Sequence, residues 1–369
     1  MAEASPAEPR CCALRWKSLP PMPTPRVYCA LGQLRCAGEI CALGGCDGRG
    51  TPLAVAERWD HGAARWLPLP PLPAPRAGAS VVTPRAQGGR PRLLMVLGGV
   101  DPGQRPLKEV VVFAEDEGRW RSAQPLPEPS MGVATVVTHE GKVFVIGGMG
   151  PNSSCHSSVL EYVEAQDRWV AMPPMPTPRY AAGAFLIDGK IYVIGGRQDK
   201  RAVTSLECLD LETRSWASLP ELPASHVFQN HGATGRLIVT AGGVVPPPPA
   251  ARARHAHPTF TSAVHAFDVR QSEWVALTRE QSLKEQRADF VMGTLGGKVV
   301  VAGGLGVGGH PLASTEVLDP DTKCWAPAGK MPTPRAACST LQTPGELYAI
   351  GGVCGGPSGA VDVLTLASE

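Results

Sequence analysis

The feature that most restricts the fold of this sequence is a short apolar segment that ends in two glycines and recurs along the chain. Residues 190–196, Lys-Ile-Tyr-Val-Ile-Gly-Gly, are a clear copy. Seven such segments end in a doublet, at Gly44-Gly45, Gly98-Gly99, Gly147-Gly148, Gly195-Gly196, Gly242-Gly243, Gly303-Gly304 and Gly351-Gly352. The first and last doublets are 307 residues apart over six intervals, so the mean period is about 51 residues. Self-similarity at such a period indicates a repeat architecture in which each unit packs on its neighbours.

Tryptophans keep step with the doublets. In four repeats the tryptophan lies 22 residues after the first glycine, at Trp66, Trp120, Trp169 and Trp325, and two further repeats carry Trp216 and Trp274. A third apolar segment, such as residues 206–210, lies between doublet and tryptophan. One period therefore predicts four strands: a first strand, the Gly-Gly strand, a strand ending near an acidic residue, and the tryptophan strand. We expect the tryptophans to be buried and to hold neighbouring units together.

Composition supports short strands joined by tight turns. The chain has 42 Gly and 38 Pro, and only 5% of its residues are aromatic. Pairs such as Asp188-Gly189 stand where a hairpin between the first two strands is needed. The continuous apolar runs before each doublet predict strands that are buried on both faces, as expected when sheets stack against each other.

The two ends of the chain complete each other. Trp16 has no doublet before it, and the last doublet has no tryptophan after it. The strand around Trp16 is therefore predicted to complete the last unit, which gives an all-β, seven-bladed β-propeller closed by pairing of the N-terminal strand with the last blade. We expect one propeller over residues 11–366, with blade seven shared between residues 14–20 and 335–366. Residues 1–10 are predicted to be a disordered tail, and residues 244–259 an inserted Pro-rich loop.

The repeats carry motifs that resemble a known family. Pro-x-Pro-Arg turns occur at residues 23–26, 73–76, 176–179 and 332–335. With the doublets and spaced tryptophans, they make the chain similar to kelch-repeat propellers throughout residues 11–366. Short strings at residues 26–28, 116–120, 147–151, 195–198 and 287–291 resemble more narrowly the kelch domain-containing protein 8 family. The resemblance implies a module whose turn-bearing face docks peptide ligands.

The repeat places several basic residues on that face. They are Arg26, Arg76, Arg179 and Arg335, with Arg287 in the same phase and His226 at the equivalent position of blade five. Blade three has Ser130 there. An arginine at such a turn can bind a partner's carboxylate with two hydrogen bonds, so these residues are predicted to contact a partner. The alternative is that each arginine braces adjacent blades through backbone carbonyls.

The inserted Pro-rich loop is the most individual feature of the chain. It carries Arg252 and Arg254 after a run of four prolines. A proline run favours the extended conformation that recognition modules bind, so the loop is a second candidate for partner binding. The alternative is an insertion that the fold tolerates without a function.

Charge and motif content exclude several classes of function. A net charge of +2 without a long basic block argues against nucleic-acid binding. No apolar run is long enough for a membrane span, and residues 1–10 lack a signal-peptide pattern, so we expect a cytoplasmic protein without membrane contact. Cys36, Cys41 and Cys46 recur every five residues, which points them to opposite faces of a strand, and no metal is expected.

No catalytic constellation is found either. The sequence lacks a nucleophile elbow, paired carboxylates that break the repeat, and the His and Tyr set that the copper oxidases built on kelch propellers require. We therefore expect no cofactor and no enzyme activity. The predicted function is a non-enzymatic, monomeric adaptor or scaffold that presents the arginine-bearing loop face to a protein or peptide partner with an acidic segment. The alternatives are the substrate-recognition subunit of a ubiquitin ligase acting through a separate adaptor, and a cytoskeletal scaffold.

Overall fold

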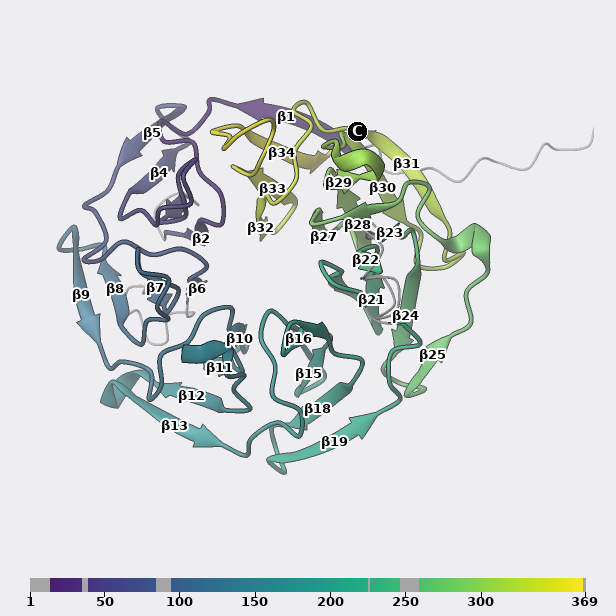
Figure 1. Ribbon diagram of the computed structural model, residues 1–369, viewed down its shortest axis with the longest axis horizontal. Coiled ribbons are helices and arrows are strands. Elements are labelled where there is room, and N and C mark those ends of the chain that lie inside the picture. The colour runs from purple at the N-terminus through teal and green to yellow at the C-terminus, as the bar shows by residue number, and fades with distance from the viewer. Residues whose placement is uncertain (1–13, 35–38, 84–93, 225, 246–258, 368–369) are drawn as a thin grey trace, which may run out of the picture.

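The chain forms a ring of seven four-stranded antiparallel sheets within the part that the structure describes (Figure 1). The structure is a computed structural model that describes residues 14–34, 39–83, 94–224, 226–245 and 259–367. Each sheet is one blade, and its first strand is innermost. The prediction of an all-β propeller with seven blades is confirmed.

Blades 1 to 3 are each built from four consecutive strands. Blade 1 contains β2 (Ala30–Gln33), β3 (Ile40–Leu43), β4 (Ala56–Asp60) and β5 (Arg65–Pro68). Blade 2 contains β6 (Ser80–Val82), β7 (Leu94–Leu97), β8 (Val110–Ala114) and β9 (Arg119–Ala123). Blade 3 contains β10 (Ala134–Val137), β11 (Val143–Ile146), β12 (Val159–Val163) and β13 (Arg168–Met172).

Blades 4 to 6 carry short extra strands in their connections. Blade 4 contains β14 (Gly183–Ile187), β15 (Lys190–Ile194), β18 (Leu206–Asp210) and β19 (Ser215–Leu219). Blade 5 contains β20 (Asn230–Thr234), β21 (Leu237–Ala241), β24 (Val264–Asp268) and β25 (Glu273–Val275). Blade 6 contains β27 (Val291–Leu295), β28 (Lys298–Ala302), β30 (Ser314–Leu318) and β31 (Trp325–Lys330).

Two-stranded ribbons and single 3-10 turns complete these connections. The ribbons pair β16 (Arg197–Gln198) with β17 (Arg201–Ala202), β22 (Val244–Val245) with β23 (Thr259–Phe260), and β26 (Arg287–Ala288) with β29 (Leu305–Gly306). The 3-10 turns are η2 (Pro151–Ser153), η3 (Glu164–Gln166), η5 (Arg279–Gln281) and η6 (Val307–Gly309). None of the described residues forms a helix with the length and hydrophobicity that crossing a membrane requires.

Blade 7 closes the ring with the N-terminal strand. It contains β32 (Ser339–Thr343), β33 (Glu346–Ile350), β34 (Val361–Leu366) and, outermost, β1 (Leu14–Leu19). The antiparallel ladder between β1 and β34 runs from the Leu14–Leu366 pair to the Leu19–Val361 pair. The closure predicted from Trp16 is therefore confirmed, and it covers an edge of β34 that would otherwise be unpaired.

The hydrophobic core lies between the blades. The described residues form seven hydrophobic clusters, and each combines side chains of two neighbouring blades. Between blades 3 and 4, for example, Phe144 and Ile146 pack with Ile191 and Val193. All four residues of β3, β7 and β11 are buried, as the continuous apolar runs before the doublets predict.

The tryptophans differ from the sequence prediction. Trp66 and Trp325 are buried, whereas the tryptophans of blades 2 to 5 are only partly covered. The partly covered tryptophans lie on the fourth strand of their blade, which is outermost and has one face toward solvent. The indoles still link blades, because an indole N–H donates to a carbonyl in the segment that leaves the preceding blade. Trp120 donates to Pro70 at 2.7 Å, and Trp216 donates to Pro173 at 2.8 Å.

Candidate interaction face

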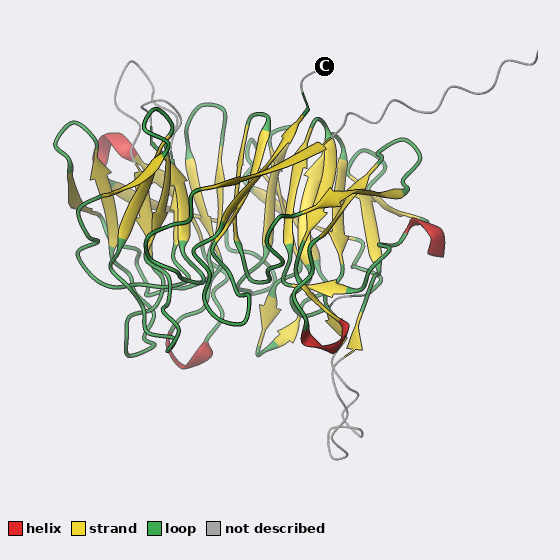
Figure 2. Ribbon diagram, turned by 90° about the horizontal axis from the view of Figure 1, so that it is seen from above, coloured by secondary structure: helices red, strands yellow, loops and turns green. Residues whose placement is uncertain are grey.

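The turns that lead into the innermost strands and the loops that follow the glycine doublets gather on one rim of the ring. We call this rim the Gly-Gly face. The two-stranded ribbons, η2 and η6 belong to it, because they lie in these turns and loops. Figure 2 shows short strands and short helices on the rim opposite the C-terminus. Every doublet glycine has a positive φ, and in blade 3 a Cβ at Gly147 would lie 2.3 Å from the carbonyl oxygen of Arg179. Only glycine fits such an approach, so the doublets let the turn of the next blade come into contact.

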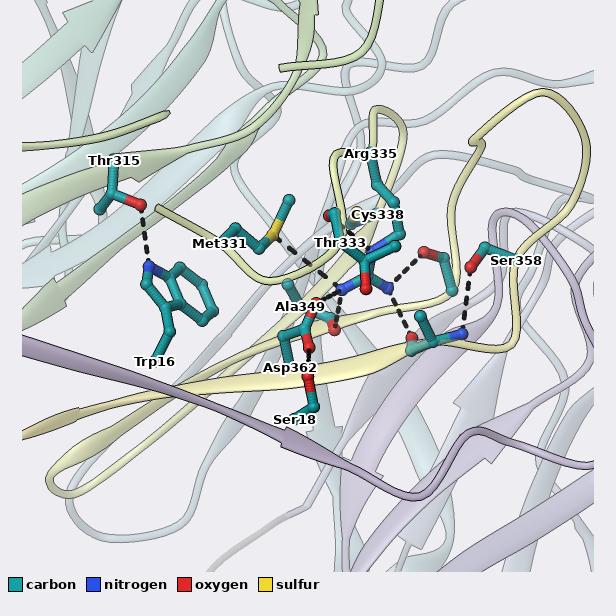
Figure 3. Close-up of polar contacts among 12 residues, drawn as sticks. Trp16, Ser18, Thr315, Met331, Thr333, Arg335, Cys338, Ala349, Ser358 and Asp362 are labelled. Carbon is teal, nitrogen blue, oxygen red and sulfur yellow. Dashed lines mark hydrogen bonds and ion pairs between the residues drawn. The ribbon is translucent and has the colours of Figure 1, made fainter. Parts of the chain in front are cut away.

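Arg335 shows how a turn arginine is held. Its side chain is fully buried in blade 7 (Figure 3). Nη1 donates to the carbonyl of Gly351 at 2.8 Å, and Nη2 donates to the carbonyl of Ala349 at 3.1 Å. Nη2 also forms an ion pair with the buried carboxylate of Asp362 at 2.6 Å. All of these partners lie in the blade that the turn enters.

The other four turn arginines repeat this geometry. Each side chain is at most 1% exposed, and its Nη1 donates to the carbonyl of the first doublet glycine and to a second carbonyl at or just before the start of the third strand. The acceptor pairs are Gly44 and Val55 for Arg26, Gly98 and Glu109 for Arg76, Gly195 and Ser205 for Arg179, and Gly303 and Ser314 for Arg287.

The backbone of each turn arginine binds the preceding blade. For Arg179, the carbonyl accepts a hydrogen bond from Gly148 N–H at 2.9 Å, and the N–H donates to the carbonyl of His156 at 3.1 Å. Gly148 and His156 belong to blade 3, whereas the guanidinium binds blade 4. Each turn arginine therefore joins two blades, its backbone to one and its side chain to the next.

This placement corrects the prediction that the turn arginines contact a partner directly. A guanidinium that is at most 1% exposed and bound to carbonyls cannot reach a carboxylate on another molecule without leaving the interior. The geometry is that of the bracing alternative. The repeat places these residues on the correct side of the ring but does not reveal that their side chains turn inward.

Four of the five arginines have a buried carboxylate partner. It lies two residues after the second carbonyl acceptor, at Glu57, Glu207, Glu316 and Asp362. Blade 2 has Val111 at this position, so Arg76 has no such partner. Burial lowers the pKa of Arg76, and the charge of Glu109 partly opposes this effect.

Blades 3 and 5 depart from the arginine pattern. In blade 5, His226 takes the place of the arginine and His265 that of the carboxylate. Burial lowers the pKa of both imidazoles, and the charge of His226 lowers that of His265 further. Blade 3 has Ser130 and Leu160 at the two positions. His226 is half-buried, and its imidazole forms a hydrogen bond with the backbone of Gly242, the first doublet glycine of blade 5, as the turn arginines do in their blades.

A second ring of residues lies at the inner edge of the Gly-Gly face, in the turns that enter the innermost strands, and we call this edge the mouth. Two positions after each arginine position, all seven residues have a left-handed backbone: Tyr28, Gly78, Gly132, Ala181, Phe228, Asp289 and Ala337. Their backbones are hydrogen-bonded around the mouth, for example from Asp289 N–H to the carbonyl of Phe228 at 3.2 Å. Non-glycine residues rarely adopt this conformation. Packing between the blades keeps these residues in the unfavourable backbone conformation, and backbone strain of this kind is common at functional sites.

The mouth presents aromatic and charged side chains together. Tyr28 is 53% exposed and Phe228 is 49% exposed. The guanidinium carbon of Arg197 lies 4.2 Å from the ring centroid of Phe228, within the range of a cation–π contact. Burial raises the pKa of Asp289, and the charge of Arg197 opposes this rise. Burial and then the charge of Asp289 raise the pKa of Tyr28.

Exposed apolar residues are concentrated on the same face. Of the five large hydrophobic residues that are exposed in the described part of the chain, four belong to the Gly-Gly face: Tyr28, Phe228, Val245 and Val307. The fifth, Leu366, ends β34 at the opposite rim. Sequence reasoning identified the arginine positions but missed Phe228 and Arg197. Counting two residues on from each arginine position would have found Tyr28 and Phe228.

The remaining sequence candidates lie elsewhere. Arg252 and Arg254, the predicted tail and most of the predicted Pro-rich loop are outside the described residues, and so is Cys36. Among the residues that the structure describes, no group of three or more His, Cys, Asp or Glu side chains is arranged to hold a metal ion.

Comparison with known proteins agrees with the repeat architecture. The family model "KLHDC2/KLHL20/DRC7 Kelch-repeats domain" matches residues 78–304, which is more than half of the chain. The chain belongs to the kelch-repeat family. A kelch motif also matches residues 286–332 of this kelch-repeat protein. The resemblance inferred from the doublets, tryptophans and turns is confirmed.

Relatives of this kelch-repeat protein match over part of their length. Kelch domain-containing protein 8B of Rattus norvegicus is 43% identical over 170 residues, covering 46% of this chain and 48% of that protein. Kelch-like protein 34 of Homo sapiens is 29% identical over 157 residues, covering 42% of this chain and 24% of that protein. The matched region thus spans about half, or less, of these relatives. A solved structure, "Structure of YjhT", has a TM-score of 0.62 at 15% identity and covers 84% of this chain and 99% of that one, which shows the shared fold.

Proposed function

We propose that this kelch-repeat protein is a non-enzymatic adaptor that binds a protein or peptide partner through the Gly-Gly face. The observation that carries the proposal is the concentration of exposed apolar residues on this face, with Tyr28 and Phe228 at the mouth. Aromatic residues that stand exposed on a rigid frame are typical centres of protein interfaces. Kelch propellers generally serve as protein-interaction domains, which supports the same function.

The buried arginines fit this function in an indirect way. By joining neighbouring blades, they fix the turns that carry Tyr28 and Phe228 two residues later. The binding residues thus stand on a pre-organised surface, and little conformational entropy is lost when a partner binds. In this proposal the turn arginines and His226 are positioning residues, and the aromatic pair makes the contact.

Charge supports a partner segment that is acidic as well as apolar. The described loops that follow the doublets carry six basic residues and four acidic ones. The basic residues are Arg49, Arg105, Lys108, Arg197, Lys200 and Arg201, and the acidic ones are Asp47, Asp101, Glu109 and Asp199. Asp101 is already paired with Arg105 at 2.7 Å. Attraction between surfaces of complementary charge raises the association rate, and salt weakens this attraction.

The experiment is proximity labelling in cells with the intact chain and a Tyr28→Ala/Phe228→Ala variant. We expect the double variant to lose partners that the wild type labels, while its thermal unfolding temperature is unchanged because both side chains are about half exposed. Leu366→Ala is the matched control, since it removes an exposed apolar residue from the opposite rim. Equal labelling by the wild type and the double variant would remove the mouth from the proposal.

The charge contribution is tested separately with Arg197→Ala on any partner so identified. The variant should bind more slowly at low salt, and its association rate should approach that of the wild type at high salt.

A variant that replaces Arg252 and Arg254 with alanine tests whether the Pro-rich loop adds to binding, which stays a prediction from sequence.

A further inference from the structure

Blade 3 lacks the arginine that five other blades bury, and its place is a cavity. Ser130 stands at the arginine position and is 4% exposed. Its hydroxyl oxygen is buried without a hydrogen-bond partner among the described residues. Next to it lies a cavity of about 310 Å³, far larger than the roughly 30 Å³ that one water molecule occupies in the liquid.

The lining of this cavity matches the surroundings of a turn arginine position by position. In blade 1 the guanidinium of Arg26 contacts atoms of Gly44, Val55, Ala42, Met22 and Glu57. The residues at the corresponding repeat positions of blade 3 are Gly147, Ser158, Val145, Leu126 and Leu160, and all five line the cavity. The cavity is therefore the arginine site of blade 3 without its arginine.

The carbonyl acceptors of the site are in place. The Ser158 carbonyl accepts the N–H of Gly147 at 2.9 Å. The equivalent Val55 carbonyl in blade 1 accepts the matching glycine N–H at 2.8 Å and also Nη1 of Arg26 at 3.1 Å. A carbonyl oxygen has two lone pairs, so Ser158 can take a second donor in the same way.

In blade 3, Leu160 stands at the position that carries a carboxylate in four other blades. Blade 2 shows that a guanidinium can be buried without that carboxylate. Arg76 is 1% exposed and donates to the carbonyls of Gly98 at 3.2 Å and Glu109 at 3.1 Å, although the carboxylate position of its blade is occupied by Val111. In blade 3 a negative charge is available at the rim instead. Glu128 lines the cavity, is 66% exposed, and lies 2.9 Å from Nδ1 of His156.

We propose that the blade 3 cavity binds the guanidinium group of an arginine from a partner protein. The guanidinium would donate to the carbonyls of Gly147 and Ser158, while Ser130 Oγ accepts a further N–H and Glu128 supplies the opposite charge. Arginine suits the site better than lysine, because its planar fork reaches two carbonyls at once. Glu128 and His156 of the lining belong to the turn and the loop that form the Gly-Gly face, but the proposal does not require that Tyr28 or Phe228 contact the partner.

Ligand-observed NMR and calorimetry with ethylguanidinium chloride test the site on the intact chain. We expect saturable binding at one site with a Kd on the order of 1 mM, and no comparable binding of ethylammonium at matched ionic strength. Ser130→Arg should fill the site from within and raise the Kd more than about tenfold. An equal Kd in the wild type and Ser130→Arg, or no saturable binding by the wild type, would overturn the proposal.

Two further variants keep the test decisive. Leu160→Glu restores the carboxylate and should lower the Kd for ethylguanidinium by about tenfold, because the hydrogen bond becomes charge-assisted. Arg76→Ala opens the matching site in blade 2 and should raise the number of bound probes from one to two.

A comparison of a capped arginine peptide with its lysine analogue then tells whether a protein side chain enters the site. Binding of ethylguanidinium without any preference for the arginine peptide would reject a protein source.

Discussion

At the scale of single residues, this propeller depends on buried cations that join its blades. A guanidinium taken from water loses its hydration, and the structure replaces it with carbonyls and, in four blades, a carboxylate. Breaking a buried pair is costly because it leaves one charge without a partner. Loss of an arginine that faces only carbonyls leaves neutral groups unsatisfied and costs less. The five arginines should therefore differ in how strongly they stabilise the fold.

Arg179→Ala and Arg76→Ala measure this difference. Arg179→Ala leaves the carboxylate of Glu207 buried and should lower the free energy of unfolding by about 3–5 kcal/mol. Arg76→Ala leaves only carbonyls and should cost about 1–3 kcal/mol. Urea unfolding of both variants gives the values. The control is Arg201→Ala, an exposed substitution that should stay within about 0.5 kcal/mol of the wild type. Equal losses at Arg76 and Arg179 would show that the carboxylate is unimportant.

His231 gives the chain a dependence of stability on pH. Burial, with a smaller contribution from the charge of Arg179, lowers the pKa of His231 from 6.5 to about 4, although its imidazole lines a pocket along the innermost strands of blades 4 to 7. The unfolded chain binds the proton more readily, so stability is full above pH 6.5 and is lost as pH falls toward 4. The loss is up to about 3 kcal/mol.

Urea unfolding of His231→Asn between pH 7 and pH 4.5 checks this prediction. The variant should lose less stability over that interval than the wild type does. The exposed His139→Gln is the control and should follow the wild-type curve. A His231→Asn curve parallel to that of the wild type would refute the assignment.

At the scale of elements, the strand that matters most is β1, because it comes from the opposite end of the sequence. It pairs with β34 along six residues, and the hydroxyl of Ser18 donates to Asp362 at 2.7 Å. The indole of Trp16 reaches beyond its blade and donates to Thr315 of blade 6 at 2.8 Å. Asp362 also holds Arg335, so the closing strand and the arginine site share a carboxylate (Figure 3).

Removal of residues 1–19 should leave β34 as an open edge. We expect the truncated chain to form soluble oligomers or aggregates, because an unpaired edge offers a template for another chain. Size-exclusion chromatography with light scattering measures the change. A synthetic peptide of residues 12–21 should restore the starting elution volume by strand addition. A truncated chain that behaves like the full-length chain without the peptide would contradict the role of β1.

At the scale of the whole molecule, the ring has no end blade. Each innermost strand contacts the innermost strand on either side, through β2, β6, β10, β14, β20, β27 and β32. The hydrophobic clusters also alternate with the blades around the ring. An open repeat array unfolds from its ends, whereas a closed ring exposes two interfaces whenever one blade is lost.

Ile191→Ala tests whether the ring unfolds as one unit. The substitution makes a cavity between blades 3 and 4 and should cost about 2–5 kcal/mol. We expect tryptophan fluorescence and far-ultraviolet circular dichroism to report one shared transition at a lower midpoint, because weakening one interface weakens the closed ring. Two separate transitions would show that the blades melt independently.

Much of this architecture was contained in the sequence. A period of about 51 residues fixed the number of blades, and the unmatched Trp16 indicated the closure. The phase of the period also placed the turns and doublets on a common face. These inferences succeed because strand order and turn chemistry are local properties, and because a repeated unit must pack against its copies to bury its apolar strands.

Only the tertiary structure decided where side chains point. The blade 7 carbonyls and carboxylate that accept from the two Nη atoms of Arg335 lie 14 to 27 residues away in sequence, so its burial depends on how a whole blade folds over the turn. The empty site beside Ser130 likewise requires the positions of atoms from three strands. The sequence determined the ring because each blade repeats the same local pattern of strands and turns, and the tertiary structure decided the sites because they form where residues far apart in the sequence come together.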